Sequence, residues 1–300
     1  MFSHFSNLPS MSVWGIFIAS IFSTNTAFAQ DRFAKVQITT QAIANNVYML
    51  VGSGGNIGVS AGHDGILIID DQYAPLAPKI QAALGELSST QNTDEIVPVK
   101  YVINTHFHGD HVGGNAHFHD NNGATIFAHH NVRVRLLDNA ALSQSSLPVV
   151  TYDNGISIHM NEDKLNVMHF AGHTDGDSVV LFEEANVLHT GDLFFNGLFP
   201  YVDLDNGGNV QAYIDSVNAL ITQIDEQTKI IPGHGPLATK ADYQAFVSMM
   251  EATYNAVKSQ KAQGMTLAEV LEIGVAEQYA SYDWRFITEA RWLATLYHSQ

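Results

Sequence analysis

The sequence contains no cysteine and few basic residues. Without cysteine the protein cannot form disulfides or use thiolate chemistry, so any bound metal must be held by His, Asp or Glu. Only 13 Lys and Arg stand against 30 Asp and Glu, which gives a formal net charge of −17 at pH 7. Because nucleic-acid binding needs clustered Lys and Arg, and the basic residues here are scattered, we expect no nucleic-acid partner.

Long apolar runs are also missing, except near the N-terminus. Residues 13–22 are apolar but too short to span a bilayer stably, and Ala-Phe-Ala at residues 27–29 fits a signal-peptidase site, although no Lys or Arg precedes the apolar segment. We therefore predict a signal peptide over residues 1–29, a periplasmic or secreted protein, and no stable membrane insertion after cleavage. The alternative is an uncleaved segment that stays in the membrane as an anchor.

The rest of the chain, residues 30–300, alternates between strand-like and helix-like segments. No linker or low-complexity segment divides it, so we predict a single α/β domain in two sheet-plus-helix halves, followed by C-terminal helices. The expected strands are 36–43, 46–51, 57–61, 65–70, 99–104, 124–128, 149–152, 156–160, 165–170, 178–183, 187–190 and 229–231. The expected helices are 74–87, 113–120, 131–140, 210–224, 239–260, one beginning near 266, and 283–298.

Residues 106–111, His-Phe-His-Gly-Asp-His, directly follow the apolar strand predicted over 99–104. Alternate residues of an extended segment point the same way, so His106 and His108 can bind one ion together. Asp110 and His111 are displaced along the turn and can bind a second ion. Imidazole and carboxylate ligands suit zinc, although they also permit manganese or iron.

Three more ligand-bearing turns follow, each at the end of a predicted strand. They are Gly-His-Thr-Asp-Gly-Asp at 172–177, His-Thr-Gly-Asp at 189–192 and Pro-Gly-His-Gly at 232–235. Glycine lets the backbone bend a ligand toward a common point. One such turn is weak evidence, because a lone histidine at a strand end is usually an ordinary hydrogen-bonded residue. Together and in this order they indicate a metal site, whereas the remaining histidines are not expected to bind metal.

With these motifs in this order, the sequence resembles the metallo-β-lactamase superfamily, from about residue 36 to residue 234 with trailing helices. The resemblance implies a four-layer αβ/βα sandwich and two zinc ions per chain. It further implies a first zinc held by His106, His108 and His173, a second held by Asp110, His111 and His234, and Asp192 as the bridge between them. Asp70, which ends its strand as in family members, would orient a ligand from behind or cap the turn.

The chemistry expected of this ligand set is hydrolysis. Two adjacent zinc ions can lower the pKa of a bound water and share the resulting hydroxide, which attacks a carbonyl carbon. Asp110 would orient this hydroxide and move a proton. Asn196 and Tyr201, in the segment after Asp192, are candidate substrate-binding residues, although the phenylalanines of that segment can equally pack the core. The glycine-rich residues 52–58 are either a flap over the site or a hairpin turn.

The position of Asp192 narrows the class of hydrolase. One penicillin-opening class of the family has cysteine there and lysine three residues later, where this sequence has Asp192 and Phe195. We therefore predict an exported zinc hydrolase that acts on a small molecule with a lactone, ester or β-lactam carbonyl. The alternatives are a mononuclear iron persulfide dioxygenase, a thioester hydrolase of the glyoxalase II type, and a non-catalytic, metal-stabilised binding module.

Overall fold

The structure is a computed structural model that describes residues 32–89 and 98–300. The predicted signal peptide lies outside the described residues. Residues 1–35 and 36–300 form separate units, and the fold below is that of residues 36–300.

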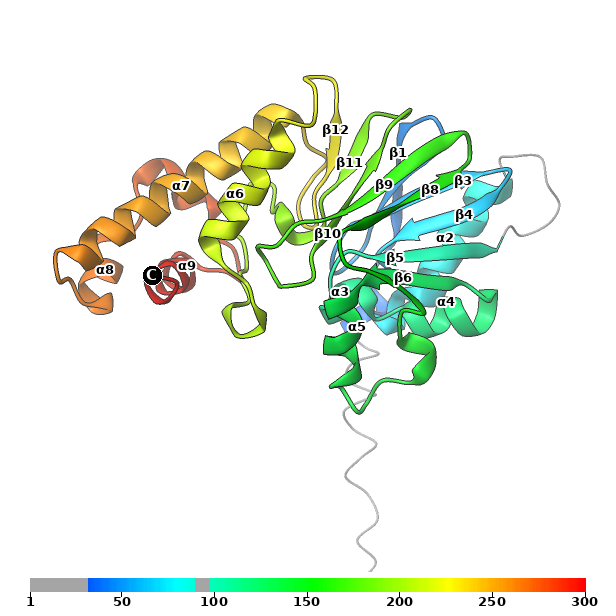
Figure 1. The fold of residues 1–300 in the computed structure, drawn as a ribbon, viewed down its shortest axis with the longest axis horizontal. Coiled ribbons are helices and arrows are strands. Elements are labelled where there is room, and N and C mark those ends of the chain that lie inside the picture. Colours follow the sequence, from blue (N-terminus) through cyan, green and yellow to red (C-terminus); the bar gives the residue numbers. More distant parts are fainter. Residues whose placement is uncertain (1–31, 90–97) are drawn as a thin grey trace, which may run out of the picture. The chain divides into compact units, whose positions relative to one another are not determined.

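The first half of the chain builds a seven-stranded sheet whose strands follow the order of the sequence (Figure 1). The first four strands are antiparallel and joined by short turns, whereas the last four run parallel and are joined by helical connections, as parallel strands require. The strands are β1 (Thr39–Ala44), β2 (Val47–Val51), β3 (Ile57–Gly62), β4 (Gly65–Ile69), β5 (Val99–Asn104), β6 (Thr125–His129) and β7 (Val150–Tyr152).

The second half builds a five-stranded sheet in the order β12-β11-β10-β9-β8. Its strands are antiparallel except for β11 and β12, which are parallel and connected through a helix. The strands are β8 (Gly155–Met160), β9 (Asp163–His169), β10 (Ser178–Phe182), β11 (Val187–His189) and β12 (Lys229–Ile231).

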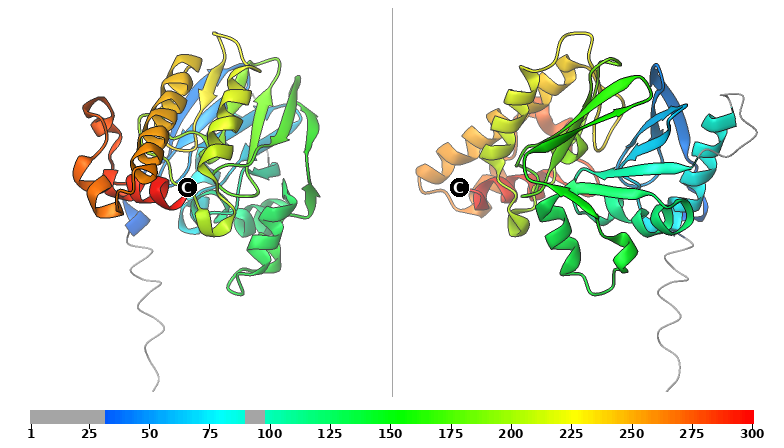
Figure 2. Two further views of the ribbon diagram at one scale, coloured as in Figure 1. Left: turned by 60° about the vertical axis from the view of Figure 1, so that its left-hand side comes forward. Right: turned by 45° about the vertical axis from the view of Figure 1, so that its right-hand side comes forward.

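Helices cover the outer face of each sheet, and a shared apolar core joins the inner faces (Figures 1 and 2). That inner core includes Ile69 and Ile103 from the first sheet and Val180 and Phe182 from the second, all fully buried. The predicted four-layer αβ/βα sandwich is therefore confirmed. The helices are α2 (Ala77–Ser89), α3 (Gly109–Val112), α4 (Asn115–Asn122), α5 (His130–Leu137), α6 (Val210–Ile221), α7 (Lys240–Ala262), α8 (Leu267–Ile273) and α9 (Glu289–His298). None in the described part of the chain is long and apolar enough to cross a membrane.

Helix α7 shows how local sequence fixes an element and its buried face. Thr239 and Asp242 form a reciprocal capping box at its start. The helix buries one apolar stripe against α6, α9 and the second sheet, because large apolar residues recur at helical spacing. The stripe consists of Tyr243, Phe246, Val247, Met250, Tyr254 and Val257.

The last helix begins later than predicted. A helix over residues 283–298 was expected, but α9 begins at Glu289, and a 3-10 helix ends at Tyr282. Two side chains cap the backbone instead: the Thr288 hydroxyl accepts from the Arg291 amide, and the Asp283 carboxylate accepts from the Glu289 amide at 2.6 Å. Such capping competes with helix continuation. Residues 283–288 therefore form a loop.

Candidate metal centre

All seven residues predicted as metal ligands lie together where loops leave the strand ends. They form two groups, and within each group the potential ligand atoms lie within 4.8 Å of one another. The residues come from the turn after β5, the β9–β10 loop, the turn after β11 and the turn after β12. Only the packing of the two sheets brings these four segments to one place. The first group is His106, His108, His173 and Asp192; the second is Asp110, His111 and His234.

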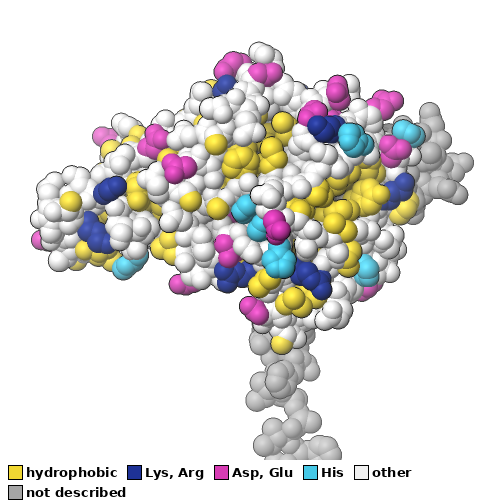
Figure 3. Space-filling view, viewed as in Figure 1, with side chains coloured by type: hydrophobic (Ala, Val, Ile, Leu, Met, Phe, Trp, Pro, Cys, Tyr) yellow, Lys and Arg dark blue, Asp and Glu magenta, His cyan; other side chains and the backbone are white. Residues whose placement is uncertain are grey.

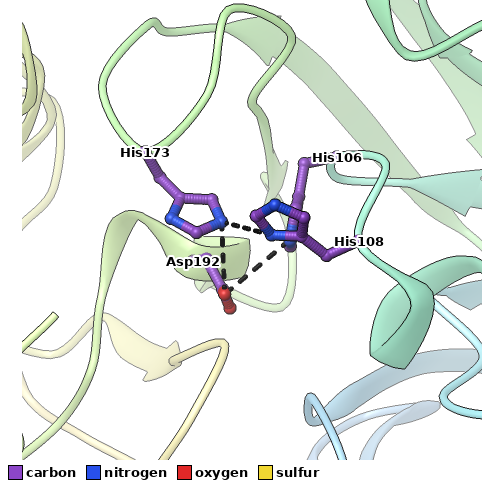
Figure 4. Close-up of side chains that lie close together, drawn as sticks. All are labelled: His106, His108, His173 and Asp192. Atoms are coloured by element: carbon purple, nitrogen blue, oxygen red, sulfur yellow. Dashed lines mark hydrogen bonds and ion pairs between the residues drawn. The ribbon is translucent and has the colours of Figure 1, made fainter. Parts of the chain in front are cut away.

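The first group converges on one point (Figure 4). The Nε2 atom of His173 lies 2.9 Å from Nδ1 of His108 and 3.4 Å from Oδ2 of Asp192. The Nε2 atom of His106 lies 3.7 Å from the same Asp192 oxygen. Three imidazole nitrogens and one carboxylate oxygen therefore face a common centre, as the ligands of a tetrahedral zinc site do.

The opposite ring nitrogen of each first-group histidine has its own hydrogen-bond partner. His106 Nδ1 lies 3.0 Å from the Thr105 hydroxyl, and His108 Nε2 lies 2.9 Å from Oδ2 of Asp203. His173 Nδ1 lies 2.8 Å from the carbonyl oxygen of Tyr201. These contacts orient the rings, and an acceptor opposite His108 and His173 leaves the inward nitrogens unprotonated for a metal.

The second group meets the other oxygen of Asp192. Its Oδ1 atom lies 3.1 Å from Nε2 of His111 and 3.3 Å from Nε2 of His234. Oδ2 of Asp110 lies 3.5 Å from His234 Nε2 and 3.8 Å from His111 Nε2. The Asp192 carboxylate thus presents one oxygen to each group, which is the placement that a bridging ligand needs.

Asp70 contacts both the turn before His106 and the ring of the candidate ligand His111. It is fully buried and adopts a left-handed backbone conformation, with φ of 65°. Its Oδ1 accepts from the Thr105 amide at 2.7 Å, while Oδ2 accepts from the Thr105 hydroxyl at 2.7 Å and lies 2.7 Å from His111 Nδ1. One carboxylate therefore fixes the turn before His106 and the ring of His111.

Burial and charge set the protonation of the ligands. Burial lowers the pKa of His106 well below its usual value, and that of His173 to about 3. Burial alone would raise the pKa of Asp192, but His111, His234 and His106 outweigh it and hold that pKa well below its usual value. Neutral imidazole and ionised carboxylate are the forms that bind metal.

Burial alone would lower the pKa of His111, but neighbouring carboxylates, led by Asp192, raise it well above its usual value. A cation at this point would displace the His111 proton and take over its attraction to the carboxylates.

The unpaired polar atoms fit a bound cation. His106 Nε2 and Asp192 Oδ1 are buried, yet neither has a hydrogen bond of normal geometry. Buried polar atoms are costly without a partner, and these two face ring nitrogens of other histidines. A metal ion satisfies such converging lone pairs, so the donor set fits metal.

The glycine-rich segment after β2 is a fixed turn rather than a free flap. The Asn56 amide donates to Gly233 O at 2.8 Å, and its side chain donates to Pro232 O at 2.8 Å. Gly55 N donates to Asp110 O at 3.1 Å. A Cβ atom on Gly55 would lie 2.2 Å from the His111 ring, so the missing side chain makes room for this ligand.

The segment after Asp192 divides between core and site. Phe194 and Phe195 are buried, and the Phe195 ring stacks on His234 with centroids 4.9 Å apart. The Tyr201 ring lies 5.5 Å from that of His108. The side-chain amide of Asn196 donates to Pro236 O at 3.0 Å. Substrate binding by Asn196 and Tyr201 stays a prediction.

Sequence reasoning missed Asp203 and the loop residues Trp284 and Phe286. Asp203 lies far along the chain from His108, and it stands in no sequence motif that would indicate a contact with a metal ligand. The two aromatic residues were assigned to a helix, although Asp283 and Thr288 are typical capping residues that indicate a helix beginning later.

Asp203 gives a test of ring orientation. We expect Asp203→Asn to weaken metal binding at the first group by about tenfold, because its carboxylate no longer holds the proton on His108 Nε2. Metal affinity is measured by competition with a chromophoric chelator. The exposed neighbour Asp205→Asn is the matched control and should bind metal as the wild type does. Equal affinity in both variants would refute a role for Asp203.

The chain is similar to a known family of proteins. A model of the metallo-beta-lactamase superfamily matches residues 44–234. The chain is 28% identical over 141 residues to a hydroxyacylglutathione hydrolase of Pelagibacter ubique, covering 47% of this chain and 54% of that protein. It is 24% identical over 159 residues to a probable metallo-hydrolase of Bacillus subtilis, covering 49% of this chain and 75% of that protein.

Among solved structures, a metallo-beta-lactamase from Pontibacter korlensis superposes with a TM-score of 0.60 at 17% sequence identity. The match covers 72% of this chain and 99% of that chain, and at this identity it shows the shared fold.

Proposed function

This chain belongs to the metallo-beta-lactamase superfamily, and from that premise we propose that it is an exported dinuclear zinc hydrolase acting on a carbonyl bond of a small molecule. The observation that carries the proposal is the Asp192 carboxylate, whose two oxygens face two separate ligand groups. An iron dioxygenase with one metal needs only the first group, so the complete second group favours the dinuclear hydrolase.

The ligand residues would hold one zinc in each group. Bound there, the zinc ions would lower the pKa of water and polarise a substrate carbonyl. The chain's own contribution is orientation: Asp70 and Asp203 fix the rings of His111 and His108. Asp110 lies at the edge of the second group with its side chain 21% exposed, so it can accept or release a proton at Oδ2.

The substrate is proposed to be a lactone, ester or β-lactam. Thioester hydrolysis is the second candidate, because one of the similar proteins is a hydroxyacylglutathione hydrolase. Export rests on the apolar segment at residues 13–22 and the small residues at its end.

Metal content and a substrate panel test this function together. Purified protein should contain two zinc ions per chain, measured by mass spectrometry of the metals, and should hydrolyse at least one of the lactones, 4-nitrophenyl esters, β-lactams and thioesters. A chelator should abolish this hydrolysis and added zinc should restore it, because the proposed chemistry depends on the metals. A single iron per chain, or hydrolysis that resists the chelator, would overturn the proposal.

A further inference from the structure

Three aromatic residues beside the metal centre form a continuous line of rings, here called the aromatic arc: Trp284, Phe286 and Tyr201. The Trp284 ring lies 6.1 Å from that of the second-group ligand His234 and 5.5 Å from that of Phe286. The Phe286 ring lies 5.6 Å from that of Tyr201, which in turn lies 5.5 Å from the ring of the first-group ligand His108. The arc therefore runs from one ligand group to the other.

Two hydrogen bonds to the backbone hold Trp284, at one end of the arc, in place. Trp284 Nε1 donates to Phe199 O at 2.9 Å, and Trp284 N donates to Ile287 O at 3.2 Å. Phe286 nevertheless keeps 49% of its surface exposed. A large, half-exposed ring in a fixed loop beside a reactive centre is an apolar surface on which part of a ligand can pack.

Arg291 stacks on this arc and has no carboxylate partner among the described residues. Its guanidinium carbon lies 4.5 Å from the Phe286 ring centroid and 5.1 Å from that of Tyr201. Its hydrogen bond is to a carbonyl, with Nη1 donating to Phe286 O at 2.9 Å. Since the Phe286 carbonyl accepts from only one of its five N–H groups, the others stay available to a ligand.

Arg291 differs from Arg135, which has a carboxylate partner. In Figure 3, histidine and acidic side chains gather near the middle of the face, with basic side chains close by. Arg135 is already neutralised by Asp175, at 2.6 Å. The nearby carboxylate of Asp203 is occupied by His108 and by Asn206. In a chain of formal net charge −17, a guanidinium next to the Tyr201 ring, which itself lies near His108, is a ready anion-binding group.

We infer that Arg291 binds a carboxylate of the substrate while the aromatic arc packs against the apolar part of the same molecule. The site then selects carbonyl compounds that carry a free carboxylate over neutral ones of the same size. This inference rests on the proposed hydrolase function and names its substrate class.

Two esters with the same leaving group and acyl chain length test the inference on the zinc-loaded enzyme. They are 4-nitrophenyl hydrogen glutarate, which carries a carboxylate, and 4-nitrophenyl pentanoate, which does not. The wild type should prefer the glutarate ester in kcat/KM. Arg291→Gln should lower this preference about tenfold, mainly by raising KM for the glutarate ester, because one charge-assisted contact is lost. Arg291→Lys should restore part of the preference, since lysine keeps the charge without the planar donor edge.

Arg285→Gln is the matched control. Arg285 is an exposed arginine of the loop that carries Trp284 and Phe286, and it stacks on no ring of the arc in the described structure. This variant therefore removes the same charge and should keep the wild-type preference. An Arg291→Gln variant that keeps the preference, or that loses both activities equally, would overturn the inference.

If the wild type hydrolyses neither ester, the proposed function fails for esters, and a binding measurement then tests the inference about Arg291. In a calorimetric titration of the zinc-loaded protein with glutarate, the inference is supported only if Arg291→Gln binds glutarate more weakly than the wild type. Equal affinity in the two proteins would overturn it.

Discussion

Asp192→Ala is expected to remove both metals and to abolish hydrolysis. In the wild type, Oδ2 of Asp192 lies 3.4 Å from His173 Nε2, and Oδ1 lies 3.1 Å from His111 Nε2. No other described carboxylate reaches both ligand groups. We expect zinc content to fall from two ions to fewer than one per chain, and kcat/KM to fall by on the order of a thousandfold or more, as when a group that organises an active site is removed.

Asp192→Asn separates charge from shape. It keeps the volume of the side chain but removes the negative charge that the surrounding histidines stabilise. We expect it to resemble Asp192→Ala in metal content, because a neutral amide is a poor bridging ligand between two cations. Asp205→Asn, an exposed change of the same kind, should retain both metals. Two tightly bound zinc ions in Asp192→Ala would remove Asp192 from the bridging position.

Asp70→Asn is expected to weaken the second metal site by about ten- to a hundredfold while the fold is retained. Asparagine tolerates the left-handed backbone of residue 70, so strain is not added. Its side-chain oxygen can still accept from the Thr105 amide. The NH₂ group would then stand where Oδ2 faces His111 Nδ1, and it would donate to that nitrogen. The His111 proton would move to Nε2, the nitrogen that must bind metal.

Asp71→Asn is the matched control for this prediction. Asp71 is equally buried and adjacent, and burial raises the pKa of its carboxyl well above the usual value, so the negative charge that asparagine removes is already disfavoured. The control should therefore bind metal like the wild type.

We expect Asp70→Asn to lose about 1–3 kcal/mol in the free energy of unfolding, measured by denaturant titration, because a charged hydrogen-bond acceptor is lost. Unchanged affinity at the second site would show that Asp70 serves only as a turn cap.

Both predictions concern residues that lie in sequence motifs. Asp192 follows a short apolar strand and a glycine, and Asp70 ends an apolar strand, and the resemblance to the family implies the role of each. The roles of Asp203, Trp284 and Arg291 were not predictable in this way. Each acts through a partner more than eighty residues away along the chain, and no local pattern encodes such a contact.

The sequence by itself determined the alternation of strands and helices, the four ligand-bearing turns and the exclusion of cysteine chemistry. These features are local, because burial periodicity, glycine turns and side-chain chemistry can be read within short segments. The tertiary structure alone decided that the two oxygens of Asp192 face different groups and that Asp203 holds His108. It also decided that the loop before α9 brings two aromatic rings, and α9 itself the guanidinium of Arg291, toward the metal centre. These contacts depend on how the two sheets and the C-terminal helices pack, because packing brings together residues that are distant in the sequence.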